Sequence, residues 1–305
     1  MSMEAVMADE LTAVVSPGTV IRRAEPLARH TTLRVGGPAD VFVEPASVAD
    51  LSATVKFCGV NRRPFFILGR GSNLLVRDGG VRGVVISLSA EIFSGITLVG
   101  DQLHCGAGAR LKYVSVEAKR QGLSGLEFLE GIPGSVGGAL RMNAGAMGKW
   151  TFDAVVSVQY MDYTGEIHER LVREVPVEYR ACPLLKTNIA LAAVFQGHTR
   201  PRAEIEQCMK SYSEKRWASQ PAAPSAGCIF KNPESIPAGK LVDELGLKGM
   251  RVGGAVVAAE HGNFIINSGG ATAGDVLALL AGVQARVLAE RGIALQPEVE
   301  IIGED

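Results

Sequence analysis

The sequence lacks a long hydrophobic run, a secretion signal and a concentrated basic patch. Its longest stretches without a charged residue contain 14 residues, whereas a membrane span needs about 20 mostly apolar residues. The N-terminus has no basic region followed by an apolar segment. With 31 basic and 32 acidic residues the formal net charge is −1, so neither nucleic acid nor a membrane surface is an expected partner.

Cysteine is scarce and scattered. The sequence contains no C-x-x-C and no Cys/His cluster, which argues against a disulfide framework and against a bound metal. We therefore expect no metal, and unpaired thiols in a reducing, cytoplasmic compartment. The five cysteines are Cys58, Cys105, Cys182, Cys208 and Cys228.

Two common nucleotide-binding motifs are also missing. The G-x-G-x-x-G fingerprint and the lysine-bearing P-loop are absent, which argues against a Rossmann dehydrogenase and a P-loop NTPase. Glycine is nevertheless abundant, at 36 of 305 residues, where about 7% is usual. Because the glycines cluster within a hydrophobic chain, they indicate backbone that approaches a ligand. The clusters are 69–71, 79–83, 106–108, 131–148 and 253–254.

Short β-type runs alternate irregularly with amphipathic helices, which predicts an α+β fold. Ser47 and Thr272 are expected to cap helices, the second of which ends at Gly292. A long loop is expected from Ser124 to Gly148. Further helices are predicted at 111–121, 201–218 and 238–245, and strands at 41–43, 65–68, 84–86, 96–108, 155–162, 167–172, 189–196, 227–230, 251–258, 263–267 and 299–302.

The predicted organisation has four parts. Residues 1–20 are expected to form a loosely ordered tail, followed by two subdomains at 21–90 and 91–200 and a C-terminal domain at 201–305. The boundary near residue 200 rests on a shift in composition.

Glycine-rich segments carry the first functional hypothesis. Leu68–Leu75 places a glycine turn after a buried strand, so its N–H groups are suited to phosphate oxygens, although an ordinary tight turn explains it equally well. Gly131–Ala139, followed by Met142–Ala146, favours backbone packed flat against a large planar ligand. A structural Ω-loop is the alternative.

Three other positions are candidates for chemistry. Arg180, after Tyr179, is suited to clamp a carboxylate or phosphate, although a single arginine is usually a surface residue. Cys228, followed by Lys231 and Asn232, is a candidate proton donor or nucleophile, although a buried, inert thiol is commoner. Glu298 lies on the same face as Glu300, an arrangement that also suits solvated charges.

Taken in order, these segments resemble the UDP-N-acetylenolpyruvoylglucosamine reductase (MurB) family, from Thr31 to Ile302. The resemblance implies an α+β fold with a two-subdomain FAD-binding part of the vanillyl-alcohol-oxidase type and a C-terminal α+β substrate-binding domain. The motifs that carry it are Leu68–Leu75, Gly125–Phe128 with Gly131–Gly138, Met142–Gly145, Tyr179-Arg180, Ala226–Pro233 and Pro297–Val299.

The resemblance also implies an activity and a site. NADPH reduces FAD, whose N5 then transfers hydride to the enolpyruvyl group of a UDP-sugar to give UDP-N-acetylmuramate for peptidoglycan synthesis. Arg180, Cys228 and Glu298 match the catalytic positions, and Tyr179, Arg216, Lys231 and Asn232 the substrate-binding positions. The implied cofactor contacts are Arg34, Gly69, Arg70, Gly71, Ser72, Asn73, Leu74, Ile132, Pro133, Gly134, Ser135, Gly138, Asn143 and Ala144.

The sequence departs from the family at the proton donor. The family usually has serine at the position of Cys228, and a thiol is the stronger acid, so we expect activity to persist. Cys182 replaces a second common serine, and the segment after Arg180 is short, as in the subclass without a long substrate-covering loop. A monomer is expected. Alternatives are another FAD oxidoreductase of this fold, such as an aldonolactone or hydroxyacid oxidase, a non-enzymatic flavin-binding protein, or a glycine-rich structural domain.

Overall fold

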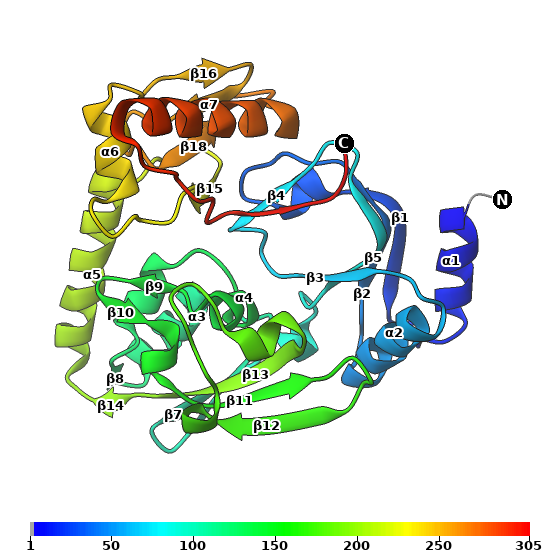
Figure 1. Ribbon diagram of the computed structural model, residues 1–305. Coiled ribbons are helices and arrows are strands. Elements are labelled where there is room, and N and C mark those ends of the chain that lie inside the picture. The colour runs from blue at the N-terminus through cyan, green and yellow to red at the C-terminus, as the bar shows by residue number, and fades with distance from the viewer. Residues whose placement is uncertain (1–2) are drawn as a thin grey trace. The chain divides into compact units, whose positions relative to one another are not determined.

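The computed structural model describes residues 3–305, which form two compact units (Figure 1). The large unit comprises residues 3–23, 41–70 and 83–215, and the small unit comprises residues 24–40, 71–82 and 216–305. These units are defined by packing alone. The predicted boundaries at residues 20, 90 and 200 separate functional domains and stay predictions. No helix within residues 3–305 is both long enough and apolar enough to cross a membrane.

The first 90 residues contribute a four-stranded sheet in the order β1-β2-β5-β3. Its β3 runs parallel to β5. Helix α2 (Val48–Val60) begins at Ser47, as predicted, because the Ser47 hydroxyl accepts the Asp50 N–H at 3.0 Å. The strands are β1 (Val20–Pro26), β2 (Pro38–Glu44), β3 (Phe65–Leu68) and β5 (Val81–Ser87).

The expectation of a loosely ordered tail was wrong for residues 3–12. They form helix α1 (Met3–Thr12), whose Met7 and Leu11 are buried in the core of the large unit with Val41 and Leu51. Met7 and Leu11 are four residues apart, so they share one face of the helix and bury it. Residues 1 and 2 of the predicted tail lie outside the described residues.

The large unit also contains an antiparallel sheet in the order β12-β11-β13-β7-β6. Helix α3 (Leu111–Arg120) packs against it with α4 (Val136–Met142), and both lie on one side of the sheet in Figure 1. The predicted strands are confirmed here. They are β6 (Ile96–Val99), β7 (Gln102–Gly106), β11 (Val155–Met161), β12 (Ile167–Leu171) and β13 (Ile189–Gln196).

Helix α4 corrects the expectation of a loop from residue 124 to residue 148. Gly137 has low intrinsic helix propensity, but the chain packs so closely that the Gly137 N–H donates to the Ala107 carbonyl at 2.8 Å. Tertiary packing therefore outweighs propensity. The same stretch includes β8 (Leu123–Ser124), which pairs with β14 (His198–Thr199), and β9 (Gly145–Ala146), which pairs with β10 (Lys149–Trp150).

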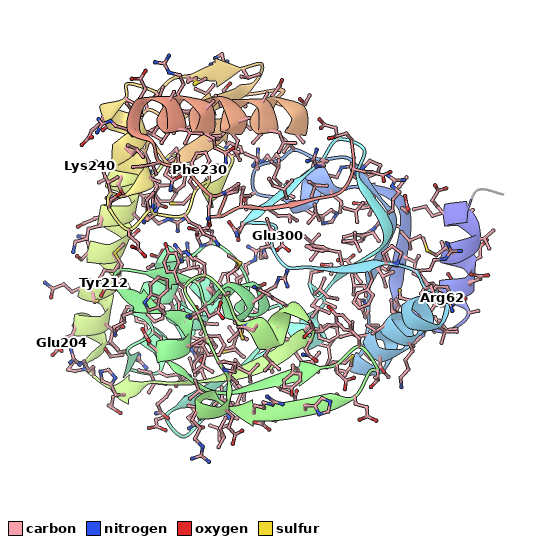
Figure 2. All side chains as sticks on the ribbon, viewed as in Figure 1. Arg62, Glu204, Tyr212, Phe230, Lys240 and Glu300 are labelled. Carbon is pink, nitrogen blue, oxygen red and sulfur yellow. The ribbon has the colours of Figure 1, made fainter. Side chains whose placement is uncertain are left out.

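The small unit contains the sheet β15-β18-β17-β16, in which β15 spans Ser225–Cys228, and a parallel pair, β4 (Leu74–Val76) with β19 (Glu300–Ile302). Helix α7 (Ala273–Arg291) covers this sheet, with the predicted Thr272 cap and with Gly292 in the left-handed conformation after its end. Phe230, labelled near α7 in Figure 2, belongs to the same core. Helix α5 (Arg202–Ser219) contributes its first part to the large unit and residues 216–219 to the small unit. The remaining elements are α6 (Ala238–Glu244), β16 (Arg251–Val252), β17 (Ala255–Val257) and β18 (Phe264–Asn267).

The strand expected at 227–230 is shifted. The observed strand is β15 (Ser225–Cys228), and its pairing with β18 changes register between Ser225 and Cys228. Gly227 has a φ of +77°, a conformation that glycine adopts without strain. A bulge therefore precedes Cys228, and the strand ends at the candidate proton donor.

Candidate active site

Cys228 and Glu298 lie on neighbouring segments of the small unit. The Glu298 N–H donates to the carbonyl of Ile229, the residue after Cys228, at 2.7 Å. Two residues further, the Lys231 N–H donates to the Gln296 carbonyl at 2.9 Å. Both side chains are partly exposed. The structure therefore brings the predicted thiol and carboxylate onto paired backbone.

A buried amide that the sequence reasoning missed fixes the residues after Cys228. Asn263 is 2% exposed, and its Oδ1 accepts the Phe230 N–H at 2.9 Å while its Nδ2 donates to the Phe230 carbonyl at 2.8 Å. The Asn263 carbonyl accepts the Ile229 N–H at 2.9 Å. The sequence signal was an amide directly before the apolar Phe264-Ile265-Ile266.

Several predicted cofactor-binding residues belong to this small unit and hold its backbone together. The Asn73 Nδ2 donates to the Glu298 carbonyl at 3.1 Å, and the Asn73 carbonyl accepts the Glu300 N–H at 3.0 Å. Gly71, with a φ of +59°, packs so tightly that an added Cβ would lie 2.3 Å from the His30 carbonyl oxygen. Packing within the protein therefore requires glycine at position 71, independently of any contact with a ligand.

Arg34, Ser72 and Leu74 are in the same unit. Arg34 has a φ of +59°, and its neighbour Leu33 accepts a hydrogen bond from the Asn267 side chain at 3.2 Å. Nearby, the Thr32 hydroxyl donates to the Ser225 carbonyl at 2.6 Å. These bonds link the predicted Arg34 segment to β15, which ends at Cys228, and to its partner strand β18.

Arg180 lies in the large unit, at a two-residue turn with Tyr179. Glu178 and Ala181 pair across the turn, with N–H···O distances of 2.9 and 3.2 Å. The turn is anchored to the end of α4, because the Asn143 Nδ2 donates to the Glu178 carbonyl at 3.3 Å. The predicted cofactor residue Asn143 is therefore bonded to the turn that carries Arg180.

Arg180 is held in an unfavourable backbone conformation. Its φ is +59°, which costs a residue with a side chain about 1–2 kcal/mol. Its guanidinium carbon lies 5.4 Å from the ring centroid of Trp150 and 5.6 Å from that of Tyr179. The two rings meet edge to face at 5.6 Å, so they limit the directions in which the guanidinium can point.

The glycine segments of the large unit come together as well. An added Cβ at Gly69 would lie 3.0 Å from the Ser135 Oγ, which places the β3 turn against the start of α4. Gly134 has a φ of +144°, and Gly138 is exposed. A side chain at Gly69 or Gly138 would occupy space beside the Ser135 hydroxyl, so this cradle fits a ligand that approaches the backbone closely, as FAD does. Ile132, Pro133 and Ala144 belong to the same segments.

The cysteines differ in accessibility. Burial raises the pKa of the Cys58 and Cys105 thiols to about 12 and also raises the pKa of Cys182, which lies in the core of the large unit. Cys228 and Cys208 are partly exposed. Cys182, which replaces a common serine of the family, is therefore buried in the core, and its thiol contacts protein instead of solvent.

The other residues predicted to bind substrate lie at the surface, and one of them caps a helix. Lys231 is exposed, while the Asn232 Oδ1 accepts the Ala238 N–H at 3.0 Å at the start of α6. The guanidinium of Arg216 stacks 5.2 Å from the Trp217 ring centroid, and its Nε donates to the Gln220 Oε1 at 3.2 Å. Their roles in substrate binding stay predictions.

Comparison with known proteins first defines a class. Residues 38–170 match a family model described as "FAD binding domain", and the fold is of the vanillyl-alcohol-oxidase type. A solved 4-ethylphenol oxidase from Gulosibacter chungangensis is 14% identical, with a TM-score of 0.50 over 66% of this chain and 44% of that chain. At this identity the likeness concerns the fold alone.

The comparisons then define a family. Residues 220–302 match the model "UDP-N-acetylenolpyruvoylglucosamine reductase, C-terminal domain". Relatives with that reductase name are 42% identical in Carboxydothermus hydrogenoformans (99% of each chain) and 45% identical in Geobacter metallireducens (93% of this chain, 95% of the relative). The crystal structure of the reductase from Thermus caldophilus is 40% identical, with a TM-score of 0.80 over 93% of this chain and 98% of that chain. The chain belongs to the UDP-N-acetylenolpyruvoylglucosamine reductase family.

Proposed function

We propose that this protein reduces the enolpyruvyl group of UDP-N-acetylglucosamine enolpyruvate to give UDP-N-acetylmuramate, a peptidoglycan precursor, with NADPH as reductant. FAD held by the glycine segments would supply hydride transfer from NADPH to the methylene carbon. The observation that carries the proposal is the pairing of the Cys228 and Glu298 segments through the 2.7 Å bond from Glu298 to Ile229. Both residues match catalytic positions of the family.

Cys228 supplies the proton that completes the reduction. Hydride addition to the methylene carbon leaves negative charge on the adjacent carbon and its carboxylate, and that carbon must then be protonated. A thiol with an ordinary pKa near 8.5 transfers a proton at neutral pH more readily than an alcohol. Glu298 acts on the carboxylate side of the same intermediate and positions it.

Arg180 stabilises the charge that develops on the substrate carboxylate. A guanidinium offers paired donors to a carboxylate, and preorganised charge is the most effective form of electrostatic stabilisation. The two aromatic rings and the anchored turn support this role, because they fix the guanidinium before substrate binds.

The glycine segments would hold FAD. Backbone at Gly69, Ser135 and Gly138 is suited to its phosphates, and Ile132 and Asn143 lie in the segment suited to the ring. Tyr179, Arg216, Lys231 and Asn232 are proposed to contact the UDP-sugar. We further propose that the protein acts as a monomer in the cytoplasm, in keeping with its free cysteines.

The test follows the two half-reactions separately. Anaerobic NADPH should bleach the yellow protein, and the enolpyruvyl UDP-sugar should then restore the flavin absorbance. Bleaching without substrate-dependent recovery would favour a different flavin oxidoreductase. A yellow protein that NADPH does not bleach would favour a non-enzymatic flavin-binding protein.

A further inference from the structure

The five-stranded sheet of the large unit carries a hollow of about 390 Å³, within the range of about 300–1,000 Å³ that is typical of small-molecule sites. All five strands contribute to it, together with Val48 at the start of α2 and Ile92 before β6. Every residue that lines it belongs to the large unit. Among the described residues, none that lines the hollow is also predicted to bind FAD or substrate.

The hollow lies on the face of the sheet opposite to Val158 and Ala193. These two residues are buried in the core of the large unit, and side chains alternate between the two faces along a strand. Ser157 and Gln159 on β11 therefore share the other face with Ala192 on β13, which pairs with Gln159. The side chains that line the hollow thus stand side by side on one face of paired strands.

Three hydrogen-bond acceptors come together in this hollow. Gln159 on β11 pairs directly with Glu169 on β12, and side chains opposed in this way have Cβ atoms about 4.5–5.5 Å apart. Ser157 lies two residues before Gln159 on the same face, and all three side chains line the hollow. A carboxylate, an amide oxygen and a hydroxyl therefore face one small volume.

Ser157 gives the strongest indication of a ligand. The residue is only 4% exposed, and its hydroxyl makes no hydrogen bond to any residue from 3 to 305. Leaving a buried hydroxyl unpaired costs free energy, so it gains from a partner that enters the hollow. The Glu169 carboxylate likewise forms no ion pair in this part of the chain.

The charge of the hollow selects the kind of ligand. Within residues 3–305, neither lysine nor arginine lines it, and Glu169 is its one carboxylate. Arg170 follows on the other face of β12, with its guanidinium carbon 6.0 Å from the Tyr160 ring centroid. Phosphates and other anions are therefore disfavoured, and a cation is favoured. Val48 and Ile92, which is 62% exposed, add apolar surface beside the acceptors.

We propose that this hollow binds a small primary ammonium ion that carries a short aliphatic chain. An ammonium group has three N–H donors and no acceptor, which matches the carboxylate of Glu169, the amide oxygen of Gln159 and the hydroxyl of Ser157. The aliphatic chain packs on the apolar surface of the same hollow. The proposal does not depend on the proposed function, because it uses no residue of the flavin or substrate site.

The test titrates n-butylammonium chloride into the holoenzyme at pH 8, where the amine is protonated, and follows binding by ligand-observed NMR. A five-atom ligand that fits well reaches a Kd on the order of 1 mM, so binding should saturate at one site. The neutral 1-butanol should not saturate, and potassium chloride should not displace butylammonium. No saturation at concentrations about tenfold above this Kd would overturn the proposal, as would equal competition by potassium.

Matched variants locate the binding. Glu169→Gln should raise the Kd about tenfold, because a charged hydrogen bond is lost, and Ser157→Ala about threefold. Glu166→Gln removes an exposed carboxylate of the same β11–β12 hairpin that does not line the hollow, so it should change the Kd by less than about twofold. If Glu169→Gln binds butylammonium no more weakly than Glu166→Gln, the site is wrong.

A steric variant tests the hollow with its charge intact. Ala192→Phe places a large ring on the face that lines the hollow and should abolish saturable binding. Unchanged binding in folded Ala192→Phe would contradict the proposal. Melting temperatures confirm that each variant is folded. If Ala192→Phe does not fold, the comparison of Glu169→Gln with Glu166→Gln still decides, because both replace exposed side chains.

Discussion

In the small unit Cys228 and Glu298 are fixed by backbone pairing and by the Asn263 amide, all in ordinary conformations except for a glycine bulge. In the large unit Arg180 occupies a left-handed conformation, held by a neighbouring turn bond and two aromatic rings. A proton donor needs an accurate position, which a hydrogen-bonded network provides. A guanidinium at the end of a long side chain must instead be limited in the directions in which it can point. Stacking on aromatic rings and a strained turn are enough to do this.

Replacing Cys228 should have the largest effect on the reaction. Cys228→Ala removes the proposed general acid, so reoxidation of the reduced flavin by substrate should slow by about 10²- to 10⁴-fold. Flavin reduction by NADPH should not change. Stopped-flow absorbance separates the two steps, and Cys228→Ser is the control that should retain much of the activity. Equal loss in both half-reactions would mean that Cys228 supports the fold or the flavin.

Thiol reagents should sharpen this result without mutation. At pH 8 a thiol with a pKa of about 12 is ionised to only about 1 part in 10⁴, so Cys58 and Cys105 should not react. Peptide mass spectrometry after alkylation should find label on Cys228 and Cys208. Only the half-reaction with substrate should be lost, and Cys228→Ser should resist inactivation. Loss of flavin reduction on labelling would contradict the assignment.

Arg180→Gly tests whether the strained turn serves function alone. Glycine relieves about 1–2 kcal/mol of backbone strain, but the change also loses cation–π contacts of about 0.5–1 kcal/mol each. The free energy of unfolding should therefore change by less than about 1 kcal/mol by these opposing contributions. Activity should fall by about 10²-fold or more, because one preorganised charge is lost. A large loss of stability in denaturant titration would contradict the comparison between the units.

Asn263→Ala should show the opposite pattern. It leaves the Phe230 N–H and carbonyl without their buried partner, which should lower the free energy of unfolding by about 3 kcal/mol. The half-reaction for which Cys228 is the proposed proton donor should slow more than flavin reduction does. Asn61→Ala is the matched control, since the Asn61 amide donates to the Phe57 carbonyl at an exposed site. A stability loss no larger than in Asn61→Ala would remove Asn263 from the supporting network.

Sequence reasoning predicted the regular elements better than it predicted the contacts of the site. Ser47 and Thr272 were recognisable as caps because their signal lies within four residues. Helix α4 was missed because its stability comes from packing on Ala107. Helix α1 was missed because it is held by two buried side chains, Met7 and Leu11. The Asn263 amide acts on Phe230, which is 33 positions away in the sequence. No local spacing encodes such contacts, whereas the positions of Cys228 and Glu298 followed from the family resemblance.

The smallest expected effect is on stability at low pH. It involves Asp275 at the start of α7, the helix that covers the sheet containing Cys228. The Thr272 and Gly254 N–H groups donate to Asp275 and lower its pKa below the ordinary value of 3.8. A carboxylate with a lowered pKa stabilises the folded state above pH 3.8, and this contribution is lost as the pH falls through the folded pKa. Wild type should therefore be more stable than Asp275→Asn at pH 7, and the gap in melting temperature should narrow below pH 3.8. A gap that stays constant from pH 7 to pH 3 would show that the charge of Asp275 does not stabilise α7, and that the Thr272 cap alone fixes the start of this helix.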